Sequence, residues 1–389
     1  MSHQINQLKR LALCSSMLVL SLSLFGCNDD DQNETTQPPT TSNEVKALKL
    51  IGDYVIPTKT MYNNIEFGGI SGLDRDAQGR YWAISDDRGG ERGAPRFYQL
   101  SIELDQAKFH RVQIKNMIYL RDQKNQFLPS DQRSMDPESI RVAANGNLYI
   151  SSEGNFVANT SNLIQPYVRE YKLNGEYVAD FQLPNIFNYV DNKTTGGRNN
   201  KLFESLAITP KGQLFTANED SLIQDGELSN LKQGGVVRIM KLDTNNHQSQ
   251  AQYAYPLEKI AHDSVAGGYP ADNGLSEMLA ISENEFIAVE RAFADGVGNT
   301  IRLYKTQISQ NTTDIQKLPS LKNAKYTAMQ KQLLLELPLT YQNIKLDNIE
   351  AISWGPTLAN GHRSLILVAD NNFSEQQATQ FIAFEVIPK

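Results

Sequence analysis

Acidic side chains recur in this sequence at a fixed spacing. Glu138 and Glu153 are 15 residues apart with a glycine between them, and Glu204 and Glu219 repeat that spacing with a glycine at the same place. Carboxylates that converge in a partly enclosed space repel one another unless they are protonated, paired with cations or bound to a metal. Carboxylate oxygens are ligands for Ca²⁺, and a carboxylate can also act as a general base. These pairs therefore predict cation binding or acid–base catalysis, with Glu138 and Glu204 as the candidate bases.

Three further copies of this pair are less regular. Ser71 to Asp86 keeps the 15-residue spacing, with serine in place of the first acid. We align a fourth copy from Glu277 to Glu290, where the turn is two residues shorter and lacks glycine, and a fifth from Glu350 to Asp370, where the turn is longer. Each acid taken alone is more simply a solvated turn residue or a strand-end cap, but recurrence favours a shared role. The carboxylates assigned to a metal are Asp86, Glu138, Glu153, Glu204, Glu219, Glu277, Glu290, Glu350 and Asp370.

Arginines close to these acids in the sequence can neutralise charge or bind an anionic substrate. Arg88, Arg141 and Arg291 are the candidate counter-ions. The guanidinium fork suits phosphate and carboxylate oxygens alike, so Arg88 and Arg291 are also candidates for catalysis. These two residues and Arg92 are the candidates for substrate binding, and Arg198 is a weaker one.

Other catalytic arrangements have less support in the sequence. It contains no His/Cys cluster with the spacing of a zinc site and no Gly-rich phosphate loop. Ser139 or Ser205 could serve as the nucleophile of a Ser-His-Asp triad, but no Gly-x-Ser-x-Gly elbow is present. The triad stays open as a minor alternative.

Each acid pair is predicted to flank a short antiparallel hairpin. In such a hairpin the first residue of one strand lies beside the last residue of its partner, so both acids lie at one edge. The copies begin 67, 66, 73 and 73 residues apart, and strand-like segments follow each hairpin. Those segments are 97–103, 168–173 with 177–183, 236–242 with 252–257, 300–308 with 332–337, and 380–387. Repeats of about four strands at this period predict a β-propeller.

The five copies predict an all-β propeller with five four-stranded blades. The last copy lacks an outer strand, and we expect residues 48–56 to supply it and close the ring. A sixth, degenerate blade within 104–136 or 309–346 is the alternative. Helix is scarce in this interpretation, and 324–335 is the only modest candidate. Because the first strand of each blade lines the axis, the acids are expected to form a ring at one mouth of the central channel.

The N-terminal region is predicted to be an export signal and a tether. Basic residues, an apolar run and Leu-Phe-Gly-Cys ending at Cys27 are typical of a bacterial lipoprotein signal, in which the cysteine is lipidated. We expect residues 1–26 to be removed, 27–44 to form a polar tether and 45–389 to form the propeller. An ordinary signal peptide or an uncleaved anchor is the alternative. Asn28 favours the outer membrane, facing the periplasm or the surface.

The predicted mature chain is acidic and has no disulfide. Without residues 1–26 it keeps 35 Lys plus Arg against 44 Asp plus Glu, a net charge of −9, which disfavours nucleic acid as a partner. Cys14 lies in the signal and Cys27 at the lipid site, so the folded part has no cysteine to pair. We expect a monomer that meets the membrane only through its lipid anchor.

Several segments resemble a known bacterial family described as esterase-like activity of phytase, or phytase-like. They are SEMLAIS at 276–282, AVERAF at 288–293, DNIEAISWGP at 347–356 and NGHRSLILVADNNF at 360–373. GISGL at 69–73 and SDDR at 85–88 resemble its opening motif, and the similarity spans about residues 65–386. Where the family more often has Ser-Asp-Asp-Asn-Phe, this chain keeps Asp370 but has Asn371 at the next position.

The resemblance implies an exported propeller hydrolase of small anionic esters, by similarity to calcium-dependent propeller phytases. Bound cations would let an acidic site attract a phosphate and activate water, so Ca²⁺ is the expected cofactor. Two other functions stay open. One is a propeller that binds a ligand or protein without turnover, in which calcium only closes the ring, and the other is a lactonase-like activity.

Overall fold

The computed structural model describes residues 44–388 apart from 88–89, 91, 131–132 and 158–162. The predicted signal peptide, Cys27, nearly all of the predicted tether and Arg88 lie outside the described residues. The described part consists of strands, turns and one 3-10 turn at Asn185–Phe187. Among these residues, no helix has the length and apolar character needed to cross a membrane.

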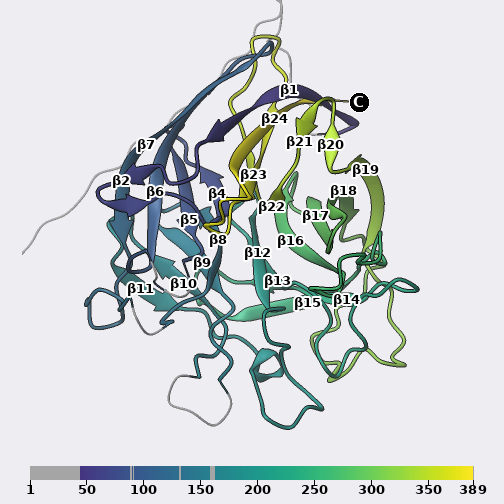
Figure 1. Ribbon diagram of the computed structural model, residues 1–389. Helices are drawn as coiled ribbons and strands as arrows, with labels where there is room; N and C mark the ends of the chain where they lie inside the picture. Colours follow the sequence, from purple (N-terminus) through teal and green to yellow (C-terminus); the bar gives the residue numbers. More distant parts are fainter. Residues whose placement is uncertain (1–43, 88–89, 91, 131–132, 158–162, 389) are drawn as a thin grey trace, which may run out of the picture. The chain divides into compact units, whose positions relative to one another are not determined.

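Twenty of the strands form five antiparallel sheets of four strands each, the blades of a propeller (Figure 1). Blade 1 is β4 (Ile70–Arg75), β5 (Tyr81–Ser85), β6 (Arg96–Leu104) and β7 (Phe109–Tyr119). Blade 2 is β8 (Pro137–Val142), β9 (Leu148–Ser152), β10 (Tyr167–Tyr171) and β11 (Tyr177–Asp180). Blade 3 is β12 (Phe203–Ile208), β13 (Leu214–Asn218), β14 (Val236–Leu242) and β15 (Ser249–Pro256). Blade 4 is β16 (Asp272–Ala280), β17 (Glu285–Ala294), β18 (Gly298–Gln307) and β19 (Gln330–Leu337).

Blade 5 joins the two ends of the described chain. It consists of β22 (Asn348–Trp354), β23 (Ser364–Asp370), β24 (Thr379–Ile387) and, as its outermost strand, β1 (Ala47–Ile56). β1 pairs with β24 from Ala47–Ile387 to Ile56–Thr379. The predicted closure of the ring by the N-terminal strand is therefore confirmed.

The five-blade prediction is confirmed and the six-blade alternative is wrong. Within the described part of 104–136 and 309–346, the strands are β7, β19 and a two-residue ribbon of β20 (Thr340–Tyr341) and β21 (Ile344–Lys345). A similar ribbon, β2 (Met61–Tyr62) with β3 (Ile65–Glu66), precedes blade 1.

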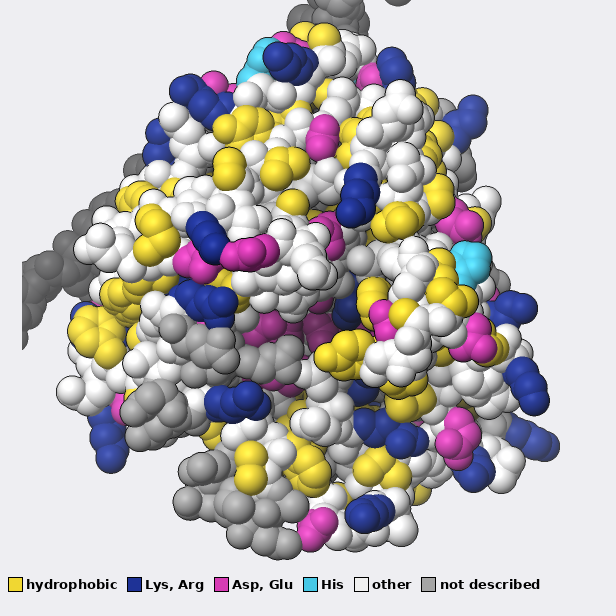
Figure 2. All heavy atoms as spheres, viewed as in Figure 1, with side chains coloured by type: hydrophobic (Ala, Val, Ile, Leu, Met, Phe, Trp, Pro, Cys, Tyr) yellow, Lys and Arg dark blue, Asp and Glu magenta, His cyan; other side chains and the backbone are white. Residues whose placement is uncertain are grey.

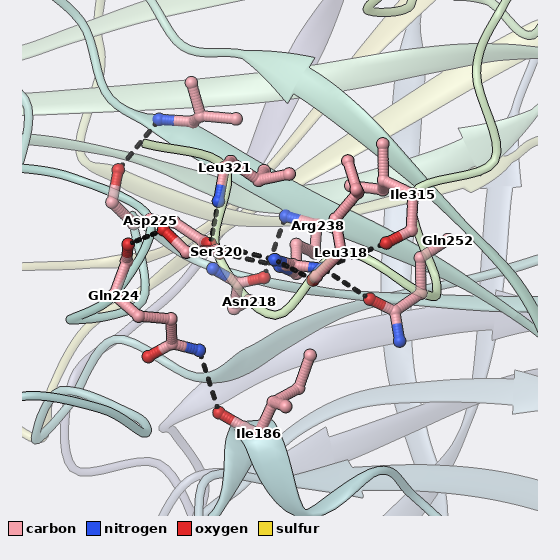
Figure 3. A network of polar contacts seen from close by, with 12 residues as sticks. Ile186, Asn218, Gln224, Asp225, Arg238, Gln252, Ile315, Leu318, Ser320 and Leu321 are labelled. Carbon is pink, nitrogen blue, oxygen red and sulfur yellow. Dashed lines mark hydrogen bonds and ion pairs between the residues drawn. The ribbon is translucent and has the colours of Figure 1, made fainter. Parts of the chain in front are cut away.

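The predicted helix at 324–335 is also wrong. Its second half, 330–335, belongs to β19, which pairs with β18, and residues 324–329 form no helix. Residues 308–329 instead leave blade 4 and lie against blade 3, where Arg238 holds them (Figure 3). The guanidinium of Arg238 is fully buried, contacts both oxygens of Asp225 at 2.6 and 2.8 Å, and donates to the carbonyls of Ile315 and Leu318. Sheet pairing and these tertiary contacts outweigh helix propensity here.

The core lies in layers between neighbouring blades. Ile84 and Ile150 belong to the layer between blades 1 and 2, and Phe215 packs edge-to-face on Phe286, with ring centroids 4.9 Å apart, between blades 3 and 4. The innermost strands β4, β8, β12, β16 and β22 contact one another in that order and close on themselves. This arrangement brings the starts of five strands to one mouth of the axis.

Candidate functional site

Every innermost strand has a β-bulge in its pairing with the second strand of the blade, directly after the first pair in blades 1 to 3, after the fourth pair in blade 4 and after the second pair in blade 5. A bulge inserts one residue and turns its side chain away from the regular alternation. The bulged residues are Ser71, Glu138, Glu204, Ser276 and Glu350. In blades 1 to 3 the recurring spacing in the sequence therefore separates the bulged residue from the residue just after the second strand.

The predicted register of the fourth copy is wrong by one residue. Leu275 pairs with Glu290, so the positions equivalent to Glu138 and Glu153 are Ser276 and Arg291, which restores the 15-residue spacing. The alignment from Glu277 to Glu290 followed the acids instead. A slip of one residue along a strand moves a side chain to the opposite face of the sheet. Glu277 and Glu290 therefore leave the ring positions, and a serine and an arginine occupy them.

Five carboxylates from blades 1 to 3 converge at the mouth. Oxygens of Asp86, Asp136 and Glu138 lie within 4.8 Å of one another, and so do oxygens of Glu138, Glu153 and Glu204. All of these side chains except Asp86 are buried. In Figure 2, Asp and Glu side chains lie at the floor of a recess near the middle of the face shown. Asp136 was not among the predicted ligands, although it lies only two residues before Glu138.

Burial and mutual repulsion raise the pKa of these carboxyls. The pKa of Glu138 and of Glu204 lies well above the usual range, first because burial removes hydration and then because neighbouring carboxylates repel the charge. Burial, with Asp136 nearby, raises the pKa of Glu153 to about 8. One oxygen of Glu153 accepts the backbone N–H of Leu202, and the other is buried without a hydrogen bond in the described structure.

The donor set fits a hard divalent cation. It offers only carboxylate oxygens, which Ca²⁺ prefers, and the buried second oxygen of Glu153 is left with its bonding capacity unused. A cation between these oxygens would replace their repulsion by attraction. The arrangement can therefore bind metal.

Two basic side chains lie in the same mouth next to further carboxylates. Lys201 Nζ is 2.7 Å from Glu219 and 3.1 Å from Asp272. Arg291 Nη2 is 3.3 Å from Glu219 and 3.7 Å from Glu350, and its buried Nε has no acceptor among the described residues. Sequence reasoning selected Arg291 but missed Lys201, whose only signal was a basic residue three positions before Glu204. The ring is thus mixed in charge.

Deeper along the axis, Glu277 is part of a buried structural ion pair. Its Oε2 lies 2.8 Å from Arg141 Nη2 and accepts the hydroxyl of Ser139 at 2.6 Å. Its Oε1 accepts the backbone N–H groups of Leu206 and Met278. Burial raises the pKa of Glu277 to about 7, although Arg141 opposes this shift. Glu277 joins blades 2, 3 and 4 at the axis and has donors on both oxygens.

Glu290 also lies apart from the acid cluster. It accepts the hydroxyl of Tyr255 at 2.8 Å and the backbone N–H of Glu258, and it contacts Lys331 Nζ at 2.7 Å. Asp370 ends β23 and accepts the N–H of Asn372. Glu290 and Asp370 therefore belong to neither of the two groups of carboxylates whose oxygens lie within 4.8 Å of one another.

The remaining candidates lie at the rim or hold loops. Arg92 lies over the ring of Phe373, with its guanidinium carbon 4.5 Å from the centroid, and 3.7 Å from Glu66. Arg198 donates to the carbonyls of Ser221 and Gly226. Arg88 lies outside the described residues.

The serines proposed for a triad have no histidine partner. The hydroxyl of Ser139 donates to Glu277, and no histidine is hydrogen-bonded to Ser139 or Ser205 in the described residues. His247 pairs with Glu170, which lies on β10, the third strand of blade 2, and not on the innermost strand that lines the axis. The described geometry does not support a Ser-His-Asp triad.

A small polar cavity of about 60 Å³ adjoins the carboxylates at Asp136. Its lining includes Tyr189, Asn199 and Asn200 from the segment between β11 and β12, and Asn155 from the segment after β9. A space of this size holds about two waters. It extends the polar surroundings of the cluster but is too small for a substrate.

Comparison with known proteins places the chain in a family. No curated protein matches it. Similar solved structures include a protein of unknown function from Dyadobacter fermentans (12% identity, 87% of each chain, TM-score 0.37) and an endo-1,4-beta-xylanase from Bacteroides thetaiotaomicron (12% identity, 88% of this chain and 92% of that chain, TM-score 0.39). The aldose sugar dehydrogenase of Streptomyces coelicolor is another (12% identity, 87% of this chain and 99% of that chain, TM-score 0.36). These low TM-scores carry no information on activity.

The family model described as phytase-like, esterase-like activity of phytase, matches residues 65–373, from the start of β3 to the first residues after β23. This match includes the cluster at the mouth and the innermost strands of all five blades. The chain belongs to the phytase-like family.

Proposed function

We propose that the protein is a metal-dependent hydrolase of small anionic esters, phosphoesters foremost, with its site at the carboxylate-lined mouth of the propeller. Family membership supports ester hydrolysis. The observation that carries the proposal is the cluster itself, in which Glu138, Glu153 and Glu204 are buried and form no ion pair with a described residue. Buried carboxylates without counter-ions are unstable in the charged form unless a cation joins them.

Ca²⁺ is the proposed ion. Asp86, Asp136, Glu138, Glu153 and Glu204 would hold it, and Ca²⁺ takes six to eight oxygen ligands in adaptable geometry. When bound, the ion supplies positive charge for an anionic ester and makes water easier to deprotonate.

The chain's own residues would orient the substrate and move the proton. Arg291 offers the unused Nε–H donor and Lys201 an ammonium, so both can hold an anionic oxygen beside the carboxylates. Glu204 is the proposed general base because it lies in the carboxylate cluster and burial raises its pKa above the usual range of a carboxyl, and Glu138 is the second candidate. Arg92 at the rim, and Arg88, are further candidates for substrate binding.

The proposal is tested by assaying the purified protein on a phosphomonoester, a phosphodiester, a carboxylester and a lactone, with calcium or with a chelator. We expect turnover of a phosphoester that is lost with chelator and restored by calcium. No turnover of any substrate, combined with a large rise in Tm on adding calcium, would contradict hydrolysis and support the non-catalytic binding propeller instead.

We also propose that the protein is a monomeric lipoprotein of the cell envelope, held at the outer membrane by Cys27 through the tether that follows. Metabolic labelling with a fatty acid tests this. Cys27→Ala should lose the label, whereas Cys14→Ala should keep it. Labelling that survives Cys27→Ala would contradict the anchor.

A further inference from the structure

The buried acids form two ligand groups that share one residue. Asp86, Asp136 and Glu138 make the first group, and Glu138, Glu153 and Glu204 make the second, each with oxygens within 4.8 Å of one another. The five acids do not meet that limit as a single group. Oxygens bound to one Ca²⁺ at 2.3–2.6 Å are at most about 5 Å apart. Each group therefore fits one ion, and the five residues together need two.

The surroundings of the shared residue also favour bound cations, because Glu138, Glu153 and Glu204 are buried close together. No described basic residue forms an ion pair with Glu138, Glu153 or Glu204. Lys201 and Arg291 contact Glu219, Asp272 and Glu350 instead, so they do not neutralise the shared residue.

The hydrogen bonds of Glu153 provide an independent indication of a ligand. One of its oxygens is held by a backbone N–H, and the other is buried with no donor in the described structure. Glu277 shows how this fold satisfies a buried carboxylate that binds no ligand, because both of its oxygens receive donors from the protein. The contrast indicates that Glu153 is built to bind something other than the protein.

We propose that the mouth of the propeller holds two divalent cations bridged by Glu138. Asp86 and Asp136 complete the first site, and Glu153 and Glu204 complete the second. The proposal rests on the proposed function for the presence of a cation and goes beyond it in the number of ions and in the residues assigned to each. Glu138 is the residue on which both sites depend.

Isothermal titration of the chelator-treated protein with Ca²⁺ at about pH 8 tests the proposal. We expect two ions per chain. Asp136→Asn and Glu204→Gln should each leave one, and Glu138→Gln should weaken both sites by about tenfold or more because both lose a charged ligand. Glu103→Gln, an exposed carboxylate of blade 1 paired with Arg111, is the matched control and should keep two.

One ion in the wild-type protein, or two ions retained in Glu138→Gln with unchanged affinity, would overturn the bridged pair while leaving the proposed hydrolase intact. No bound ion together with no turnover would remove both proposals.

Thermal unfolding without calcium checks that the variants fold, and each neutralised acid should raise Tm slightly because repulsion between carboxylates is relieved. If Asp136→Asn fails to fold, Asp86→Asn replaces it as the test of the first site. If Glu204→Gln fails to fold, Glu153→Gln replaces it as the test of the second.

Discussion

At the scale of single residues, the donors around a carboxylate decide its role. Glu153 and Glu277 are both buried glutamates close to the axis, and burial raises the pKa of both. Glu277 is paired with Arg141 and receives three hydrogen bonds besides, whereas one oxygen of Glu153 receives none from the described residues. The first therefore stabilises the fold and the second is available to a cation.

Glu277→Gln should destabilise the protein by about 3–5 kcal/mol, because it leaves Arg141 buried without its counter-ion. Denaturant unfolding at pH 8 measures this. The variant should still bind calcium in the wild-type ratio, which distinguishes it from the cluster variants. The double variant Arg141→Met with Glu277→Leu should recover most of the loss. Wild-type stability in Glu277→Gln would show that the pair is dispensable.

Arg291→Gln should change catalysis and metal binding in opposite directions. We expect kcat/KM for a phosphoester to fall by about tenfold or more, because a charge-assisted donor to the substrate is lost. Calcium affinity should rise, because a positive charge near Glu204 and Glu350 is removed. Enzyme kinetics and calcium titration measure the two effects, with Arg198→Gln as the control, since its guanidinium holds a loop. A fall in both quantities would argue against a role in binding the anion.

At the scale of elements, the bulges position the chemistry and β1 closes the ring. The bulge in each innermost strand places one residue per blade in the ring, irrespective of whether it is acidic. Serine holds this place in blades 1 and 4, so the acids at the bulged position are on blades 2, 3 and 5 only. The ring of blades is closed by a different element, the pairing of β1 with β24.

Phe384→Ala should weaken this closure. Phe384 is fully buried on β24 between Leu50 of β1 and Leu365 of β23, so truncation should cost about 3–5 kcal/mol of unfolding free energy. Urea unfolding measures it, and Val55→Ala, at an exposed position on β1, should stay within about 0.5 kcal/mol of wild type. Equal losses in the two variants would contradict a special role for the buried layer.

At the scale of the whole molecule, the mouth couples stability to pH and to metal. The folded-state pKa values of Glu138, Glu153, Glu204 and Glu277 all lie above the ordinary value of 4.5. The folded protein therefore holds these protons more tightly than the unfolded chain does. The contribution of Glu277 and Glu153 to stability is complete below about pH 4.5 and is lost as pH rises through about 7 and 8, and Glu138 and Glu204 act in the same direction.

The Tm of the chelator-treated protein should accordingly fall as pH rises from about 6 to about 9. Added calcium should flatten this dependence, because a cation replaces the protons at the cluster. Thermal unfolding across pH, with and without calcium, measures both effects. A Tm that rises with pH in the absence of metal would show that these carboxylates are ionised and compensated in some other way.

The local pattern of strands and turns is encoded in the sequence. Strand alternation, hairpin turns and a steady period depend on neighbours along the chain, so five blades, the closing strand and the places of Glu138, Glu153 and Glu204 were readable in advance. The prediction for the fourth blade was wrong because Glu277 and Glu290 each lie one residue from the ring positions, which Ser276 and Arg291 occupy. Only the pairing of Leu275 with Glu290 distinguishes these registers.

Which charged side chains meet depends on how the blades pack. Asp136 and Lys201 belong to connecting segments, and their positions beside the ring depend on how neighbouring blades pack. Likewise, the pairing of Arg141 with Glu277 joins residues more than a hundred positions apart. Electrostatic interaction depends on distance in space and on burial, and no spacing along the chain encodes either one.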